Sequence, residues 1–243
     1  EGADMCFITC GLGGGTGSGS ISIIGEVAKK LGILTIGIVT MPFAMEGNRR
    51  YENAVYGLER LAEASDTLIV IPNDKLLELA PDLPIHTAFK VADEILTNAV
   101  KGIAELVTKA GLVNLDFADV KAIMKSGDVA TVGMGTSDTA RRVEEAVEEA
   151  LSNPLLDISY EGATGALIHV TGGQDMTLEE IDRTCQLITQ SLHQEANVIW
   201  GARVDDQHAK RITVMSIMTG VSSPQLLGKE TKEDTVEAGA KVS

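Results

Sequence analysis

The chain has few aromatic residues and a deficit of positive charge. Aromatic residues make up 3% of its 243 residues, so stacking platforms for single-stranded nucleic acid are scarce. Lysine and arginine number 20 against 35 aspartates and glutamates, and the net charge of −15 repels phosphate backbones. We therefore expect no nucleic acid among the partners of this protein.

Long apolar runs and paired cysteines are also absent. No run approaches the roughly 20 consecutive apolar residues of a membrane span, so we expect no direct membrane insertion. The three cysteines form no CxxC pair and the four histidines have no metal-ligand spacing. This pattern argues against a disulfide framework and against a protein-held metal. Reduced thiols are typical of the cytoplasm, where we expect the protein to reside.

Strands alternate with helices in the first part of the chain. Apolar, strand-forming runs occupy residues 5–10, 33–41 and 67–71, and helices are expected after the first run and over residues 48–64. Nearly continuous apolar strands are typical of a parallel sheet covered on both faces. The order β-α-β-α-β therefore predicts an α/β fold with a doubly wound parallel sheet. The buried face expected for the first helix comprises Ile21, Ile24, Ala28 and Leu31.

The second part of the chain predicts a further domain. A helix over residues 85–109 carries two apolar stripes, which suits a helix at the seam between two domains. Beyond an acidic loop and a short helix, the order β-α-β-α-β-β predicts an α+β domain with a four-stranded sheet, reaching residue 221. One of its helices, over residues 138–151, has a charged face, and Thr177 with Glu180 forms a capping box for the next. Residues 222–243 are polar, and we expect a mobile tail.

A glycine-rich run lies between the first strand and the first helix. Free backbone N–H groups and the helix dipole favour an anion at such a position, and glycines let the backbone approach phosphate oxygens closely. A merely flexible turn is the alternative, but so many glycines in ordered structure are costly without a reason. The run comprises Gly11, Leu12, Gly13, Gly14, Gly15, Thr16, Gly17, Ser18, Gly19 and Ser20.

Two common nucleotide motifs do not match this run. The dinucleotide fingerprint G-x-G-x-x-G requires glycine or alanine at its sixth position, which every register fills with serine or threonine. The P-loop requires Gly-Lys-Ser/Thr, but the first lysine of the chain is Lys29. Neither of these common nucleotide motifs is therefore present.

Residues 13–19 instead match the sequence G-G-G-T-G-[ST]-G, and the chain resembles FtsZ, the tubulin-like cell-division GTPase of bacteria and archaea. The resemblance covers about residues 1–221, and the ending after Val221 is more typical of archaeal members. It implies a tubulin/FtsZ-like fold. Residues 1–84 would be the C-terminal half of the GTP-binding domain, 85–111 the central helix, 112–125 the synergy loop with a short helix, and 126–221 the C-terminal activation domain.

The start of the chain suggests a fragment. It opens with Glu1 in place of an initiating methionine, directly before a strand-like run. Complete family members have earlier strands and a first glycine-rich loop that also holds the phosphates. We therefore expect that the N-terminal part is missing, that a sheet edge is left open, and that this chain alone binds GTP weakly.

Glu46 and Arg50 follow the second strand, at the carboxyl edge of the expected sheet, where open α/β sheets bind ligands. Taken alone, they favour a helix N-terminus with an acidic first turn and solvated arginines. The resemblance implies that Glu46 contacts the ribose and that Arg50 lies beside the nucleotide.

Phe89 and Asp93 lie one helical turn apart and share a face. Their spacing alone favours a core phenylalanine and a surface aspartate. The resemblance implies that the ring packs against guanine and that the carboxylate accepts from its N1–H and 2-amino groups. Adenine has no such pair of donors, so Asp93 would select GTP over ATP.

The acidic loop has both a local and a catalytic interpretation. Asp116 could cap the following helix, with Asp119 in its first turn. The resemblance implies that Asn114, Asp116 and Asp119 form the synergy loop, which enters the nucleotide site of the next subunit and orients the attacking water. The cofactors would be GTP or GDP with Mg²⁺ held mainly by the nucleotide, because phosphoryl transfer depends on positioning and electrostatics.

The function implied by the resemblance is a GTPase that polymerises head-to-tail into filaments of the cell-division ring, in the cytoplasm at midcell. Its partners would be copies of itself and division-ring adaptor proteins. A non-catalytic tubulin-like paralogue, an NAD-dependent oxidoreductase and a structural interaction domain remain alternatives. The complete N-x-D-x-x-D motif argues against the first and the failed dinucleotide fingerprint against the second. Loss of assembly on mutation of the glycine loop would argue against the third.

Overall fold

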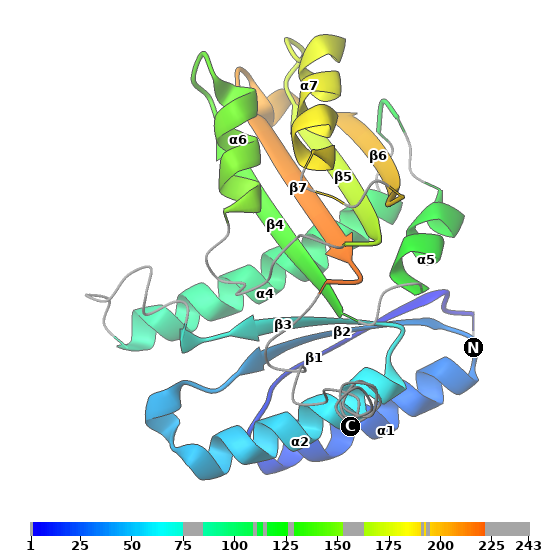
Figure 1. The fold of residues 1–243 in the computed structure, drawn as a ribbon, viewed down its shortest axis with the longest axis vertical. Helices are drawn as coiled ribbons and strands as arrows, with labels where there is room; N and C mark the ends of the chain where they lie inside the picture. Colours follow the sequence, from blue (N-terminus) through cyan, green and yellow to red (C-terminus); the bar gives the residue numbers. More distant parts are fainter. Residues whose placement is uncertain are drawn as a thin grey trace, which may run out of the picture.

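One continuous sheet runs through the protein (Figure 1). The computed structural model describes residues 2–74, 85–108, 111–113, 116–125, 129–152, 163–190, 192 and 195–221. Within these residues the strand order is β1-β2-β3-β4-β7-β5-β6. The strands are β1 (Met5–Gly11), β2 (Leu34–Met41), β3 (Thr67–Pro72), β4 (Val129–Ser137), β5 (Gly165–Gly172), β6 (Asn197–Val204) and β7 (Ile212–Thr219).

The first three strands are parallel, as their apolar sequences predict. Strand β3 pairs with β4 in parallel, through only two residue pairs, Leu68 with Val129 and Ile69 with Ala130. Beyond this joint the sheet is mixed, because β7 lies antiparallel between β4 and β5 while β6 is parallel to β5. The expected four-stranded sheet is therefore the second half of one larger sheet.

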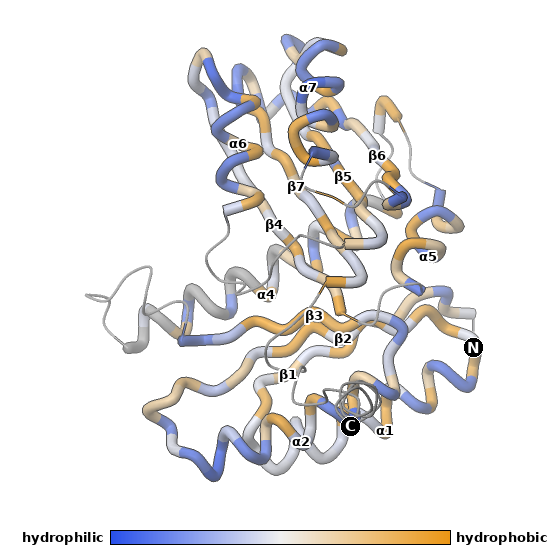
Figure 2. The backbone as a smooth tube through the Cα atoms, in the orientation of Figure 1, coloured by the Kyte–Doolittle hydropathy of each residue, from blue (hydrophilic) through white to orange (hydrophobic). Residues whose placement is uncertain are grey.

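Helices cover both faces of the sheet. In Figure 1, α1 and α2 lie against one face of β1 to β3, α4 crosses the other face, and α6 and α7 cover the far half. The central strands are hydrophobic along most of their length (Figure 2). The helices are α1 (Gly15–Lys30), α2 (Asn48–Ala64), α4 (Ile85–Thr108), α5 (Phe117–Lys125), α6 (Arg142–Leu151) and α7 (Leu178–Thr189), with short 3-10 turns η1 (Ala44–Glu46) and η2 (Asp206–His208).

Helix α4 joins the two halves of the molecule. Its buried residues Ala99 and Ile103 belong to one apolar core that also contains side chains of β2, β3, β4 and β7. Glu105 of α4 also pairs with Arg203 of β6, with Nη1 and Oε2 3.3 Å apart. A helix that packs on both halves of the sheet fixes their relative position, as the two apolar stripes indicate.

The buried face predicted for α1 is wrong in part. Ile21 and Ala28 are buried, but Ile24 and Leu31 are 51% and 64% exposed. The helix instead packs through small residues, because a Cβ added at Gly25 would lie 2.9 Å from the carbonyl oxygen of Ala64 at the end of α2. Close approach of the two helices therefore selects the face with the smallest side chains. The buried residues of α1 are Ser18, Ile21, Ser22, Gly25 and Ala28.

Two helices begin at other residues than their sequences predict. Helix α1 begins at Gly15, inside the glycine run, so the run is helical from Gly15 onward. Helix α6 begins at Arg142 and not at residue 138. There, Ser137 Oγ donates to Glu145 Oε2 at 2.6 Å, and Thr139 Oγ1 donates to the same oxygen at 2.8 Å. These hydroxyl groups hold a turn that competes with the first turn of the helix.

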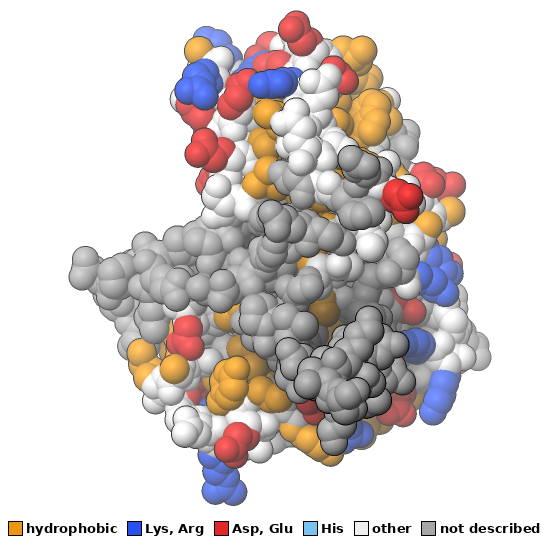
Figure 3. All heavy atoms as spheres, in the orientation of Figure 1, with side chains coloured by type: hydrophobic (Ala, Val, Ile, Leu, Met, Phe, Trp, Pro, Cys, Tyr) orange, Lys and Arg blue, Asp and Glu red, His pale blue; other side chains and the backbone are white. Residues whose placement is uncertain are grey.

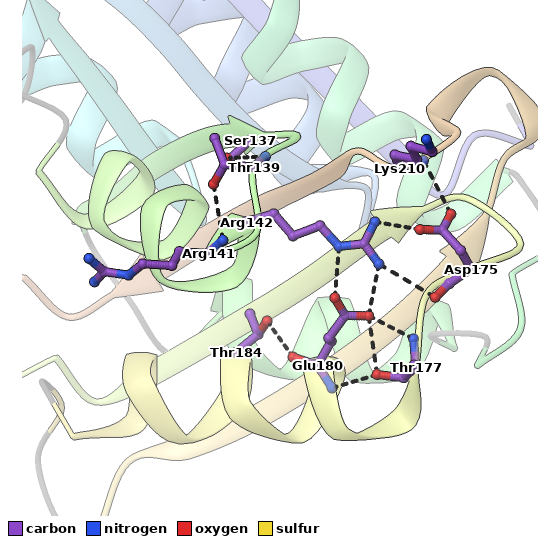
Figure 4. Close-up of polar contacts among 9 residues, drawn as sticks. All are labelled: Ser137, Thr139, Arg141, Arg142, Asp175, Thr177, Glu180, Thr184 and Lys210. Atoms are coloured by element: carbon purple, nitrogen blue, oxygen red, sulfur yellow. Dashed lines mark hydrogen bonds and ion pairs between the residues drawn. The ribbon is translucent and has the colours of Figure 1, made fainter.

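An ion-pair network ties α6 to the start of α7 (Figure 4). Arg142 donates from Nε to Glu180 Oε1 at 2.7 Å and from Nη1 to Asp175 Oδ2 at 2.6 Å. Glu180 also accepts from the backbone N–H of Thr177, which completes the predicted capping box. Figure 3 shows charged side chains of both signs at the end of the molecule formed by α6 and α7.

The network changes the acidity of its members. The hydrogen bond from Arg142 lowers the pKa of the Asp175 carboxyl. Burial alone would raise the pKa of Glu180, but the hydrogen bonds from Arg142 and Thr177 outweigh it, so the net shift is downward. Both carboxylates are therefore charged at neutral pH and hold α7 against α6.

Among the described residues, no helix has the length and hydrophobicity needed to cross a membrane. The expected tail, residues 222–243, lies outside the described residues.

Candidate functional site

The glycine run forms a tight turn at the carboxyl end of β1. Gly13 has φ +99°, and a Cβ added there would lie 2.9 Å from the backbone oxygen of Arg50, so a larger residue would be strained and crowded. The Gly13 N–H donates to the buried Ser18 Oγ at 2.9 Å. A Cβ at Gly17 would lie 2.8 Å from the Gly11 carbonyl oxygen. Glycine at positions 13 and 17 is thus required by the fold of the loop itself.

Other glycines of the run face open space. A Cβ added at Gly14, Gly15 or Gly19 would meet no atom within 4 Å. Gly14 is the N-cap of α1, and the first turn of this helix contains no acidic residue. The unpaired N–H groups and the positive end of the helix dipole are therefore accessible to an anion. Thr16 and Ser18 lie in this first part of the helix, Thr16 exposed and Ser18 buried.

A second turn, at the end of β2, lies against the glycine loop. Glu46 Oε1 accepts from the Phe43 N–H at 3.0 Å, and the other carboxylate oxygen, Oε2, is ion-paired with Arg50. Glu46 lies in η1 and not in the first turn of α2, which begins at Asn48. The acidic first turn of the alternative is therefore absent from α2, whereas its solvated arginines are present, because Arg49 and Arg50 are exposed.

Phe89 and Asp93 lie on the exposed side of the first turns of α4. Phe89 is 43% exposed, and Asp93 is exposed. The Phe89 ring contacts Phe43 edge to face, with centroids 5.2 Å apart and planes at 87°. Phe89 is thus not the core residue that its spacing alone favours. The glycine loop, the Glu46 turn and the start of α4 all lie at the carboxyl ends of the parallel strands (Figure 1).

The acidic pair lies at the opposite ends of these strands. Asp116 and Asp119 are exposed at the start of α5, which packs through Val120 and Ile123 near Leu34, the first residue of β2. The Asp116 carbonyl oxygen accepts from the Asp119 and Val120 N–H groups at 3.0 and 3.2 Å. Its side chain accepts from the Ala118 N–H at 3.4 Å, so Asp116 also caps the helix. Asn114 lies outside the described residues.

The two groups therefore belong to opposite ends of one sheet. The glycine loop follows the last residue of β1, and α5 contacts the first residue of β3, since Thr67 Oγ1 donates to the Met124 carbonyl oxygen. A strand of six to eight residues spans about 20 Å. No rotation of side chains brings Asp119 of this chain to its own glycine loop.

Comparison with known proteins identifies the family and the fold of the chain. A family model described as "Tubulin/FtsZ family, GTPase domain" matches residues 1–81, and one described as "FtsZ family, C-terminal domain" matches residues 128–222. The structure of an FtsZ W319Y mutant from M. jannaschii superposes with TM-score 0.85 and 52% identity, covering 92% of this chain and 68% of that one. This chain belongs to the FtsZ family. The tubulin/FtsZ-like fold predicted from the glycine motif is thereby confirmed.

Archaeal relatives of the FtsZ family are similar over nearly the whole chain. "Cell division protein FtsZ 1" of Thermococcus kodakarensis is 58% identical over 233 residues, which are 96% of this chain and 62% of the relative. The structure titled "FtsZ dimer, empty" from M. jannaschii has TM-score 0.84 and 54% identity, covering 89% of this chain and 63% of that one. The chain thus spans a little over three fifths of these relatives.

The structure adds two residues to the site that sequence reasoning missed. Phe43 contacts both Phe89 and Glu46, and Asp74 accepts from the Ala44 N–H through Oδ1 at 2.9 Å and Oδ2 at 3.2 Å. Glu46 stands three residues after Phe43, the spacing of the glutamate in a capping box, but phenylalanine lacks the hydroxyl group of that motif, so only half of the signal was present. Asp74, 30 residues beyond Ala44, left no such signal because only the pairing of β2 with β3 brings it near.

Proposed function

We propose that this chain is a GTP-binding and GTP-hydrolysing protein that assembles head-to-tail, so that each active site is shared by two copies. The glycine loop of one copy, residues 13–19, holds the phosphates. Asn114, Asp116 and Asp119 of the next copy complete the site and orient the attacking water.

One observation carries this proposal. The anion-binding loop and the acidic pair are both exposed, but they lie at opposite ends of the parallel strands. Stacking copies along the strand direction would bring the acidic pair of one copy to the glycine loop of the next. Such a heterologous contact does not close on itself and generates an open filament.

The remaining nucleotide contacts follow from the geometry of the carboxyl ends. Glu46, held by the Phe43 N–H, would accept from the ribose hydroxyl groups, and Arg50 beside it would lie near the phosphates. The exposed ring of Phe89 would pack on the base, and the exposed Asp93 one turn further would read the guanine edge. This division of contacts between phosphate, ribose and base favours GTP over ATP.

We propose that a divalent cation binds at this site through the phosphates of the nucleotide. The described residues include no group of three or more histidine, cysteine, aspartate or glutamate side chains that could hold a metal ion. Mg²⁺ commonly keeps several waters and binds through substrate phosphates together with one or two carboxylates. Bound in this way, it would neutralise charge on the phosphates, while the protein positions the nucleotide and the water.

The shared site can be tested by mixing two inactive variants. Gly14→Asp places a carboxylate at the phosphate loop, and Asp119→Ala removes one acid of the pair. Each variant alone should hydrolyse GTP at background rate. Random one-to-one mixing unites an intact loop with an intact acidic pair at about a quarter of head-to-tail contacts, so part of the activity should return.

The matched control is Asp182→Ala, which removes an equally exposed carboxylate on α7, away from both half-sites. It should retain the activity of the parent chain. The assay uses millimolar GTP and a series of protein concentrations, over which turnover per copy should rise. Mixtures that stay at background, or turnover per copy that is independent of concentration, would contradict a shared site. Absence of turnover at every concentration would favour a non-catalytic paralogue.

The wider role follows from the same proposal. A filament of this kind would belong to the cell-division ring at midcell in the cytoplasm, with division-ring adaptor proteins as further partners. We also propose the division into residues 1–84, 85–111, 112–125 and 126–221, which the two-pair joint between β3 and β4 supports.

A further inference from the structure

Phe43 lies just after the carboxyl end of β2 and contacts both Phe89 and Glu46. Its side chain is 2% exposed, whereas the ring of Phe89, which it contacts, is 43% exposed. The two rings meet edge to face at 5.2 Å and 87°. This geometry lies within the range that aromatic pairs prefer. The buried ring therefore sets the orientation of the exposed one.

The backbone of Phe43 orients a second group. Its N–H donates to Glu46 Oε1 at 3.0 Å, which leaves Oε2 for Arg50. The next N–H, that of Ala44, donates to both carboxylate oxygens of Asp74 at 2.9 and 3.2 Å. Two carboxylates thus hold the turn in which Phe43 sits, one from the turn itself and one from the end of β3.

We propose that Phe43 is a positioning residue that couples the ribose and base subsites of the nucleotide site. This inference rests on the proposed function and assigns Phe43 a role toward GTP that requires no direct contact. Its N–H fixes the carboxylate that would hold the ribose, and its ring fixes the ring that would pack on guanine. An exposed phenylalanine without this neighbour would lose rotamer freedom when the base binds. Because Phe43 already holds the ring of Phe89 in one orientation, this loss is avoided.

The test compares two probes, GTP and inorganic triphosphate. Phe43→Met keeps an apolar side chain of similar reach but removes the ring. An edge-to-face pair contributes about 0.5–1.5 kcal/mol, so GTP should bind about two- to tenfold more weakly to this variant. Inorganic triphosphate has neither ribose nor base and should bind as it does to the parent chain. Phe7→Met, the same change on β1, is the matched control and should bind both probes normally.

A double-mutant cycle separates positioning from general destabilisation. If Phe43 acts through Phe89, then adding Phe43→Met to a Phe89→Leu chain should weaken GTP binding no further. Thermal unfolding and circular dichroism check that each variant is folded. If Phe43→Met does not fold, Phe43→Tyr supplies the result, because it keeps the ring and should retain parental GTP binding.

The outcomes separate this inference from the proposed function. Equal weakening of both probes, additive effects in the cycle, or weakened GTP binding by a folded Phe43→Tyr chain would overturn the role of Phe43 while the GTP site stands. Absence of saturable GTP binding by the parent chain up to millimolar concentration would overturn the proposed function and this inference together.

Discussion

Replacing Gly14 by aspartate should strengthen the fold and weaken nucleotide binding at the same time. Gly14 is the N-cap of α1, with φ −87° and ψ 167°, a conformation that any residue adopts. A Cβ there meets no atom within 4 Å. The substitution therefore introduces a charge without strain or steric conflict, at the position where the phosphates would lie.

The effect on stability follows from helix capping. Aspartate is among the best N-cap residues and is a few tenths of a kcal/mol better than glycine. A carboxylate near the positive end of the helix adds about 0.3–1 kcal/mol at an exposed site. The free energy of unfolding should rise by about 0.5–1 kcal/mol, which raises the Tm of a chain this long by about 1–4 °C.

The effect on binding has the opposite sign. A carboxylate about 4 Å from a phosphate charge is repelled by about 1 kcal/mol at the dielectric constant of water and more in a less polar site. A nucleotide presents more than one such charge. Affinity for GTP should fall at least tenfold, since about 1.4 kcal/mol corresponds to a factor of ten.

The matched control is Gly14→Asn, which has nearly the same shape and caps a helix about as well but carries no charge. Titration of a fluorescent guanine nucleotide, with competition by GTP, measures the affinities of both variants at low salt. Gly14→Asn should bind within about threefold of the parent chain if its side chain does not block the site, because the charge causes most of the loss. Equal affinities for the aspartate and asparagine variants would refute a phosphate site at this loop.

Two further predictions concern packing and pH. Gly25→Ala should lower the free energy of unfolding by about 1 kcal/mol or more in urea titrations, because the new Cβ would lie 2.9 Å from the Ala64 carbonyl oxygen. Gly19→Ala in the same helix meets nothing and should instead raise it by about 0.5–1 kcal/mol; equal effects would contradict the α1–α2 contact. Burial, and to a lesser degree Arg203, lowers the pKa of His169 to about 4. Because the unfolded chain takes up that proton first, stability present at pH 7 should be lost between about pH 6.5 and 4, by up to about 1.4 kcal/mol per pH unit. His169→Gln should lack this part of the slope in unfolding curves recorded at both ends of the range.

Several helices and strands could be predicted because their bounds depend on local features, namely apolar periodicity and capping residues. Helix α2 and strand β6 have the bounds that their apolar patterns indicate, and the capping box of α7 forms as its spacing predicts. The errors arose where a tertiary contact determined which face of a helix is buried. In α1, hydrophobicity favoured burial of Ile24 and Leu31, but the contact with α2 required the smallest side chains and selected the face of Gly25.

The candidate site could be predicted in its parts but not in its assembly. The glycine run was recognisable from its position between a strand and a helix, and the acidic pair from its match to a family motif. Periodicity contains no information on the contact between Phe43 and Phe89, residues 46 positions apart in sequence, because that contact depends on how α4 crosses the end of β2. Asp74 was missed for the same reason.

The parallel strands relate the two half-sites by a fixed geometry. The glycine loop follows β1, and α5 packs at the first residues of the neighbouring strands β2 and β3. A distortion of this part of the sheet would therefore move both, and β2 and β3 are buried along nearly all of their length. Buried, close-packed strands transmit displacements with little loss. A second copy must therefore present its acidic pair by moving as a body, and its alignment depends on the whole contact between the copies. The rate of hydrolysis by such a site would therefore depend on correct alignment of two whole copies, and not on the conformation of either loop alone.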